Sequence, residues 1–391
     1  MSYIGKTPTS VPLTSSDITD GIITTTKIAD ANVTNPKLTS GSQQNFRNII
    51  INGDMSIAQR GTSEASVTTT GYYTCDRWNW IADYGTVTLS QDTDVPTGQG
   101  FATSFKADVT TAGTEDSGGY VLVRQRIEGQ NLQYLKKGTA SAESLTASFW
   151  IKSTKTGTYI AELYDADNDR QISKSYTVDT TNTWEKKTIT FAGDTSGAFG
   201  NDNGGSLFLN LYLSAGTDYT SGTLNTSWNS STDANRVVGQ VNAQDNTANN
   251  IYFTGVQLEA GTTASDFEFL PVDVNLGRCM RYYEKLIMSN IAAVGYSNST
   301  SNAITVMTSS YIKRTSPSLT IPPAGNGAGL ISFLTNAGVY PSTFGSIAVF
   351  DTNITSFSLN QTGMTGAYSG AGLGVALYGA DGESIGIDAE L

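Results

Sequence analysis

Few residue types in this sequence could carry out catalysis. Histidine is absent, which excludes the Ser-His-Asp and Cys-His arrangements and every metal site built on imidazole. The two cysteines, Cys75 and Cys279, lie far apart and form no CxxC pair, although the count alone allows one disulfide between them. The chemistry that remains open is hydrolysis of a glycosidic bond, because two carboxylates suffice for it.

Carboxylates that could form such a pair occur at Glu128, Glu143, Glu162, Asp165 and Glu185. The two acids of a glycosidase lie roughly 5 to 10 Å apart. Nothing in the spacing of these five residues singles out a pair, and acids scattered over a surface are the ordinary expectation. The sequence therefore predicts a protein that is not an enzyme, with a polysaccharide depolymerase as the alternative.

The segment Asp165–Asp169 has oxygen-bearing side chains at alternate positions, as a calcium-binding loop does at its start. An EF-hand loop needs Gly at its sixth position and Glu at its twelfth, but this sequence has Arg170 and Tyr176 there. A hairpin turn explains the same residues, because Asp and Asn favour turns. We predict the turn and no cofactor, and a structural calcium ion remains the alternative.

Aromatic side chains could bind sugars, since a ring offers apolar area to a sugar face. Trp78, Trp80, Trp150 and Trp184 lie on or beside alternating strands, where aromatic residues usually face a core. Trp228 lies in a polar loop and is predicted to be exposed. Further aromatic residues stand among Gly, Ser, Asn and Thr, on a surface that suits either glycans or contacts between identical subunits. The receptor or glycan-binding candidates are Trp228, Tyr311, Tyr340, Phe344 and Tyr368.

The charge balance excludes other classes of partner. The chain has 391 residues, 23 Lys and Arg, 35 Asp and Glu, and a net charge of −12. Nucleic-acid binding needs clustered Lys and Arg, so it is not expected. No apolar run reaches the roughly 18 residues of a membrane-spanning helix, and the first residues do not form a secretory signal.

Short runs that alternate apolar and polar residues fill the chain between residues 47 and 270, separated by Gly, Asn, Asp and Thr. This pattern is typical of half-buried antiparallel strands. It predicts an all-β fold with a jelly-roll sandwich. Residues 271–286 predict one short linking helix, and residues 287–391 predict a smaller C-terminal β domain.

Residues 1–46 contain no Trp and consist mainly of polar residues, with an internal repeat. Asp20–Ile28 is followed ten residues later by the similar Asp30–Leu38. Such a short unit buries its apolar residues only by stacking on neighbours or on other chains. We predict an extended arm that orders in an oligomer or on a partner, with a disordered tail as the alternative.

Several segments occur in an order that resembles one group of proteins. They are Asn48–Gly61, Tyr73–Trp78, Arg124–Gln130, Ser148–Ser153, Trp184–Thr188, Thr254–Gly261 and Arg278–Lys285. Together they resemble the tail-fibre or virion structural proteins of bacteriophages, notably those of marine bacteria and cyanobacteria. The resemblance covers residues 45–290, and the first residues, MSYIG, also resemble the leading segments of such fibres.

This resemblance implies a jelly roll similar to carbohydrate-binding modules, in a homotrimeric tail fibre that attaches to a host-surface polysaccharide. The expected location is the virion, with neither nucleic-acid binding nor membrane insertion. The arm would bind other virion proteins through Tyr3, Ile4, Ile23, Ile28, Val33 and Leu38. The linking helix would lie on the three-fold axis through Val272, Leu276 and Met280. A head-decorating appendage and a free carbohydrate-binding protein are further alternatives.

Overall fold

A computed structural model describes residues 46–287, 290–297, 303–321, 331–335, 338–340, 346–362, 374–379 and 384–391. The chain divides into two units, Met1–Gln44 and Asn45–Leu391, and all described residues belong to the second. The predicted anchoring residues Tyr3, Ile4, Ile23, Ile28, Val33 and Leu38 lie outside the described residues.

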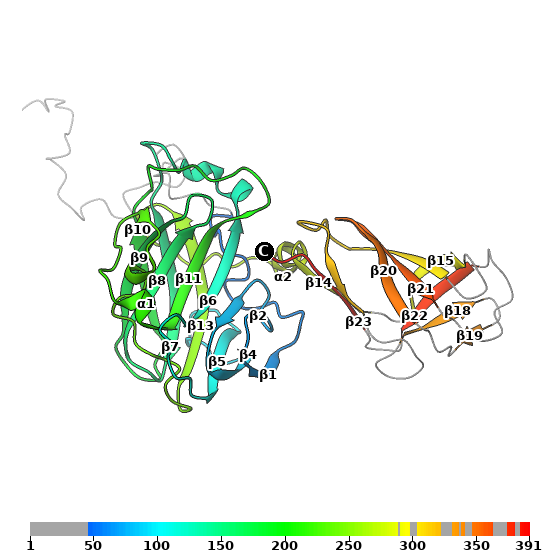
Figure 1. The fold of residues 1–391 in the computed structure, drawn as a ribbon, viewed down its shortest axis with the longest axis horizontal. Helices are drawn as coiled ribbons and strands as arrows, with labels where there is room; N and C mark the ends of the chain where they lie inside the picture. Colours follow the sequence, from blue (N-terminus) through cyan, green and yellow to red (C-terminus); the bar gives the residue numbers. More distant parts are fainter. Residues whose placement is uncertain are drawn as a thin grey trace, which may run out of the picture. The chain divides into compact units, whose positions relative to one another are not determined.

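Two antiparallel sheets form a sandwich from residues 63–260 (Figure 1). In spatial order, the first sheet contains β1 (Ser63–Val67), β4 (Thr86–Asp92), β5 (Ser104–Thr111), β13 (Asn250–Ala260), β7 (Leu145–Ser153) and β10 (Glu185–Phe191). The second contains β12 (Asn229–Ser230), β9 (Arg170–Val178), β8 (Gly157–Asp165), β11 (Gly205–Ala215), β6 (Tyr120–Glu128), β3 (Asn79–Ala82) and β2 (Gly71–Tyr72). Neighbours in each sheet are mostly distant in sequence, as in jelly rolls.

Alternation along the strands builds the core between the two sheets. On β7, Leu145, Ala147, Phe149 and Ile151 all belong to the buried core, whereas Trp150 between them is only half-buried. Side chains on a strand point to opposite faces in turn, so this pattern gives each strand one apolar face. The predicted all-β sandwich is confirmed.

The tryptophans predicted to lie in the core divide into two groups. Trp78 and Trp80 are buried in the core between the sheets. Trp150 and Trp184 are half-buried outside it, and the Trp184 ring packs edge-on against Tyr252. The prediction was therefore wrong for Trp150 and Trp184, because both project from the outer side of the first sheet.

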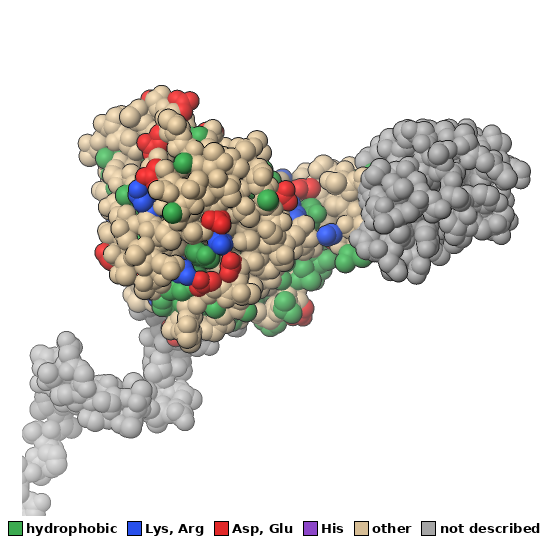
Figure 2. Space-filling model, turned by 90° about the horizontal axis from the view of Figure 1, so that it is seen from below, with side chains coloured by type: hydrophobic (Ala, Val, Ile, Leu, Met, Phe, Trp, Pro, Cys, Tyr) green, Lys and Arg blue, Asp and Glu red, His purple; other side chains and the backbone are tan. Residues whose placement is uncertain are grey.

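Short helices complete the sandwich. They are η4 (Gly129–Asn131), η5 (Gln133–Leu135), α1 (Thr217–Thr220) and η6 (Asp233–Asn235). The visible face in Figure 2 carries few charged side chains, and these form small groups of both signs. This agrees with a charged fraction of only 15%.

Helix α2 (Val272–Met280) follows the sandwich but is shorter than predicted. Residues 283–286 were expected to continue the helix and instead belong to strand β14 (Tyr283–Ile287). Strand β14 pairs with β23 (Ser384–Asp388), which also pairs with β17 (Ser318–Thr320). The helical prediction was wrong here because a strand about a hundred positions later supplies the backbone partner.

The chain leaves this three-stranded sheet after β14, returns to it at β17 and returns again at β23. Between β14 and β23 lies a seven-stranded antiparallel sheet. Its strands, in spatial order, are β19 (Gly338–Tyr340), β18 (Ile331–Thr335), β22 (Gly374–Gly379), β15 (Asn290–Ser297), β16 (Ala303–Thr308), β21 (Ser356–Thr362) and β20 (Ser346–Thr352). Within the described ranges, no helix has the length and apolar character that crossing a bilayer requires.

Candidate functional site

The loop tryptophan proposed from the sequence, Trp228, is half-buried rather than exposed. Its ring packs against the core, and its indole Nε1 donates to the Ala192 carbonyl at 2.7 Å. The Lys137 Nζ lies 5.4 Å from the ring centroid. Much of this side chain is therefore already used in holding the β12 loop against the sandwich.

The other receptor candidates are distributed over the C-terminal part of the chain. Tyr311 is 45% exposed, and its ring lies next to Gly277 of helix α2. Tyr340 lies on strand β19, whose backbone alone is described, and Phe344 and Tyr368 lie outside the described residues. The structure does not bring Tyr311 together with Trp228 in a common pocket.

The three residues proposed for a trimer axis have different environments. Leu276 packs within its own chain against a small buried cluster of Ile51, Ile57, Cys279 and Tyr282. Met280 is half-buried, and its carbonyl accepts a hydrogen bond from Lys313. Val272 is 67% exposed. Val272 is thus the exposed residue of the three, whereas the other two are half-buried.

The five acids considered for catalysis are held in ion pairs. Glu128 accepts from Arg281 Nε and Nη2, both at 2.8 Å, and Glu162 accepts from Arg236 at 2.8 and 2.9 Å. Asp165 pairs with Lys137, Glu143 with Lys136, and Glu185 with Lys187.

Two of these acids also have perturbed pKa values. Burial disfavours the charged form of Glu128, but the hydrogen bonds from Arg281 outweigh it and lower the pKa of the carboxyl. Glu185 is affected similarly, because bonds from Lys187 and from backbone amides lower its pKa. A general acid needs the opposite shift. Neither of these two residues therefore has the raised pKa of a general acid.

Asp165–Asp169 forms the turn between β8 and β9, as predicted. Asp165 Oδ1 accepts from the amides of Asp167 and Asn168 at 3.0 and 3.2 Å, and its Oδ2 accepts from the Asn168 side chain at 2.9 Å. In the part of the chain that the structure describes, no three acidic or cysteine side chains gather into a metal site. The oxygens of Asp165 are thus engaged without an ion.

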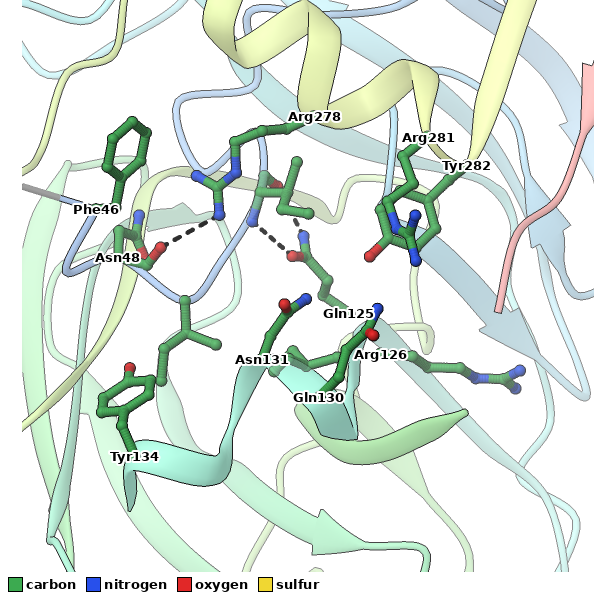
Figure 3. Close-up of a pocket in the computed structure, with 13 residues that line it drawn as sticks. Phe46, Asn48, Gln125, Arg126, Gln130, Asn131, Tyr134, Arg278, Arg281 and Tyr282 are labelled. Atoms are coloured by element: carbon green, nitrogen blue, oxygen red, sulfur yellow. Dashed lines mark hydrogen bonds between the residues drawn. The ribbon is translucent and has the colours of Figure 1, made fainter. Parts of the chain in front are cut away.

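A cavity of about 410 Å³ opens beside helix α2 (Figure 3). It lies within the range of roughly 300 to 1,000 Å³ that is usual for ligand pockets. Its walls combine apolar, amide and guanidinium groups. The lining residues are Phe46, Asn48, Ile49, Ile51, Gln125, Arg126, Ile127, Gln130, Asn131, Tyr134, Arg278, Arg281 and Tyr282.

Buried amides fix the extended segment that forms one wall. Asn48 Oδ1 accepts from the amides of Ile50 and Leu258, both at 3.0 Å, and its Nδ2 donates to the Val256 carbonyl at 3.2 Å. Gln125 of β6 bonds both backbone groups of Ile51, at 2.7 and 2.8 Å. The segment is therefore held between β13 and β6 by side chains that satisfy its backbone.

The opposite wall comes from the two short 3₁₀ helices. Gln130 and Asn131 on η4 point toward the middle of the pocket, and Tyr134 on η5 and Phe46 lie on one side of it (Figure 3). Phe46 is 63% and Tyr134 is 41% exposed. The Gln130 amide nitrogen donates to Glu128, so the pocket offers exposed ring surface next to the Asn131 amide.

Three arginines complete the lining. Arg281 is held by Glu128, and Arg126 donates to the Leu391 carbonyl at 2.6 Å. Arg278, on helix α2, donates only a long bond of 3.4 Å to the Asn48 carbonyl. This end of the pocket is therefore positively charged.

None of these residues was proposed as a site from the sequence. They come from positions 46–51, 125–134 and 278–282, which only the fold brings together. One signal was available, since three segments that carry the family resemblance, Asn48–Gly61, Arg124–Gln130 and Arg278–Lys285, all supply lining residues.

No family model and no curated protein sequence matches the chain. Among solved structures, the enzymatically active domain of tailspike protein 4 from bacteriophage CBA120 is similar over 55% of this chain, with 16% identity and a TM-score of 0.31. The chain spans about a fifth of that protein's length, 21%.

Two carbohydrate-binding modules are also similar. One is a family 4 module, with 14% identity and a TM-score of 0.27 over 54% of this chain and 97% of that one. The other is TmCBM61, solved with β-1,4-galactotriose, with 10% identity and a TM-score of 0.29 over 55% of this chain and 99% of that one. The fold assignment itself rests on the order of strands in the two sheets.

Proposed function

We propose that this chain is a glycan-binding structural protein of a bacteriophage virion, a homotrimeric tail fibre anchored through residues 1–46. The observation that carries the glycan-binding part is the pocket beside α2, where three segments of the resemblance converge. The sequence analysis expected the receptor site in the C-terminal domain. The pocket now favours the sandwich, since it is there that the described residues form a cavity.

The pocket's chemistry suits a sugar. A pyranose has apolar ring faces and hydroxyl edges, so it requires aromatic surface beside hydrogen-bonding groups. Phe46 and Tyr134 supply the rings, and Asn131 and Gln130 supply amides that donate and accept. The affinity of one site can be modest, because three copies in a fibre, and several fibres on a particle, multiply it.

The test is titration calorimetry with oligosaccharides cut from the host's surface polysaccharide. We expect Tyr134→Ala to weaken binding about tenfold, because a lost aromatic contact is worth roughly 1 kcal/mol or more. Tyr311→Ala is the comparison variant, since it removes another exposed tyrosine that contacts α2 but does not line the pocket. Weakening by Tyr311→Ala alone would instead place the receptor site in the C-terminal domain, and no binding by the parent chain would contradict glycan recognition.

The assembly is tested by light scattering on the full-length chain. A homotrimer has three times the 41.4 kDa mass of one chain. We expect Val272→Asp to weaken the trimer, because Val272 is the exposed apolar residue of α2. A monomeric parent chain would contradict the trimer, and absence of the chain from purified phage particles by mass spectrometry would contradict the virion location.

A further inference from the structure

We propose that the pocket beside α2 selects a sugar residue that carries an acid group, and that Arg278 recognises this group. The inference rests on the proposed glycan-binding function and names the class of glycan. It follows from the charges of the lining, from the partners of each arginine and from the burial of Arg278.

The charge of the pocket is opposite to that of the protein. The whole chain carries a net charge of −12, with 35 acidic and 23 basic residues. The pocket lining nevertheless contains three arginines and neither Asp nor Glu. An anion is therefore attracted to this cavity although the chain as a whole repels it.

The three arginines are not equivalent. Arg281 is neutralised by two hydrogen bonds to Glu128 at 2.8 Å. The Arg126 guanidinium extends away from the pocket centre and donates to the Leu391 carbonyl, so its stem rather than its charge faces the cavity (Figure 3). Arg278 is left as the charge that a ligand can meet.

Arg278 lacks an acidic partner within the described part of the chain. It forms no salt bridge there, and its one hydrogen bond is the 3.4 Å contact with the Asn48 carbonyl. Glu268 contributes a favourable charge nearby, but its Oε2 accepts the Asn48 amide at 2.9 Å. The guanidinium therefore retains donors for a further acceptor.

Burial strengthens the attraction of an anion to the unpaired donors of Arg278. The surroundings of Arg278 lower the pKa of its guanidinium, because burial removes water from the charge. A partly desolvated charge gains more from an ionic hydrogen bond than one in bulk water. An acid group on the ligand would then satisfy donors that the protein itself leaves unpaired.

The remaining lining places a sugar ring beside that acid group. Arg278 comes from the α2 wall, whereas Asn131 and Tyr134 come from the opposite wall and Phe46 from the side (Figure 3). A pyranose between these walls could place its ring on the aromatic residues and its hydroxyls on the amide. A carboxylate or a sulfate can direct two of its oxygens at the planar guanidinium and accept two parallel hydrogen bonds from it.

The experiment compares three probes by calorimetry: a galacturonic acid trisaccharide, the same trisaccharide with its carboxyl groups reduced to alcohols, and a sulfated galactose trisaccharide. We expect the carboxylate or the sulfate form to bind the parent chain at least about tenfold more tightly than the neutral form, a difference of about 1.4 kcal/mol. The preference should fall as salt rises, since salt screens the charge.

Arg278→Gln should remove this preference for the acidic probes, and Arg278→Lys should retain part of it. Lys285→Gln is the matched control, because it removes one exposed positive charge that does not line the pocket. Thermal melting of each variant checks that it is folded.

The outcomes separate the two proposals. Equal binding of acidic and neutral probes, or a preference that survives in folded Arg278→Gln, would overturn recognition of an acid group and leave glycan binding intact. Failure of all three probes and of the host's own oligosaccharides would overturn glycan binding itself. A preference for the sulfated probe alone would support the role of Arg278 and identify sulfate as the acid group.

Discussion

The sandwich and the junction next to it differ in the size of their apolar clusters. We use "junction" for residues 272–287, 309–320 and 384–391 together with the sandwich residues that they contact. The sandwich core is a large cluster of buried apolar side chains from both sheets. The apolar cluster that α2 contacts is small, with Ile51, Ile57, Cys279 and Tyr282 as buried members. Ile385, Ile387 and Ala389 of the junction are buried as well.

The junction also contains buried ion pairs. Arg77 is almost fully buried, pairs with Glu390 and lies 3.5 Å over the Tyr282 ring. Burial opposes the charge of Arg77, but Glu390 outweighs it and raises the pKa of the guanidinium. Lys313 and Glu284 form a second pair at 2.6 Å, with side chains 0% and 1% exposed.

The two regions should therefore respond differently to substitutions and to pH. Apolar burial is non-directional and tolerates substitutions of similar volume, so the sandwich should depend on packing. A buried ion pair contributes little net stability when intact, but removal of one partner leaves a charge without compensation. The junction should therefore be specific and sensitive to single polar changes and to pH.

The largest effect is expected in the sandwich core. Phe149 is fully buried and packs edge-on against Tyr176 and Phe253, with ring centroids 5.2 and 6.2 Å apart. Phe149→Ala should lower the free energy of unfolding by about 4 kcal/mol, because it removes apolar contacts and leaves a cavity. Lys186→Ala on the exposed side of β10 should change it by less than about 0.5 kcal/mol. Chemical denaturation measures both, and equal effects would contradict a packed core.

A slightly smaller and more local effect is expected in the junction. Glu390→Gln leaves the Arg77 charge buried without its partner and should destabilise the junction by about 3 kcal/mol. Hydrogen exchange should accelerate in β14 and β23 while β7 stays protected. Asp388→Asn is the control, because Asp388 is 37% exposed and an exposed pair contributes less than about 1 kcal/mol. Equal acceleration in β7 would show that the junction and the sandwich unfold as one unit.

The sequence predicts the sandwich much better than the junction, for a physical reason. The strands can be predicted from local alternation. In Leu145–Ser153, for example, every second residue from Leu145 to Ile151 is apolar and faces the core. The ion pair of Arg77 joins residues 313 positions apart, and no local pattern marks such a pair. Strand β14 was assigned to a helix for the same reason, since its partner β23 lies at the end of the chain.

The candidate pocket was missed because its residues have ordinary local roles. Arg278 and Asn131 have nothing in their neighbouring residues that distinguishes a ligand contact from a surface position. Trp228 was chosen from the sequence because it is an aromatic residue in a polar loop. In the structure its ring is partly covered by the sandwich. Tyr134 was not selected, although the structure leaves its ring 41% exposed at the pocket.

A pH effect of intermediate size is expected at Asp76, beside the junction. Its carboxylate is fully buried and accepts from the Gln59 amide at 2.9 Å, and burial raises its pKa to about 6 from 3.8. The folded chain therefore holds this proton more tightly than the unfolded chain. Its contribution to stability is complete below about pH 4 and is lost as the pH rises to about 6, at a cost of about 3 kcal/mol.

Asp76→Asn should remove this pH dependence, because the amide stays neutral and can still accept from Gln59. The measurement is the free energy of unfolding of both chains between pH 4 and pH 7, in the same denaturant series. A parent chain whose stability does not fall between about pH 4 and pH 6 relative to the variant would show that Asp76 ionises normally.

The smallest expected effect lies at Gly277, inside helix α2. Glycine is unfavourable there by about 1 kcal/mol relative to alanine, yet a Cβ on Gly277 would lie 2.6 Å from Tyr311 Oη. Gly277→Ala alone should therefore change stability little, since the gain in helix propensity is offset by displacement of the Tyr311 ring. In a Tyr311→Ala background the same substitution should stabilise the chain by about 1 kcal/mol. Thermal melting of this double-mutant cycle measures the coupling. Equal effects of Gly277→Ala in both backgrounds would show that the ring moves aside freely, and that this contact of the junction, unlike its buried ion pairs, does not fix the position of α2.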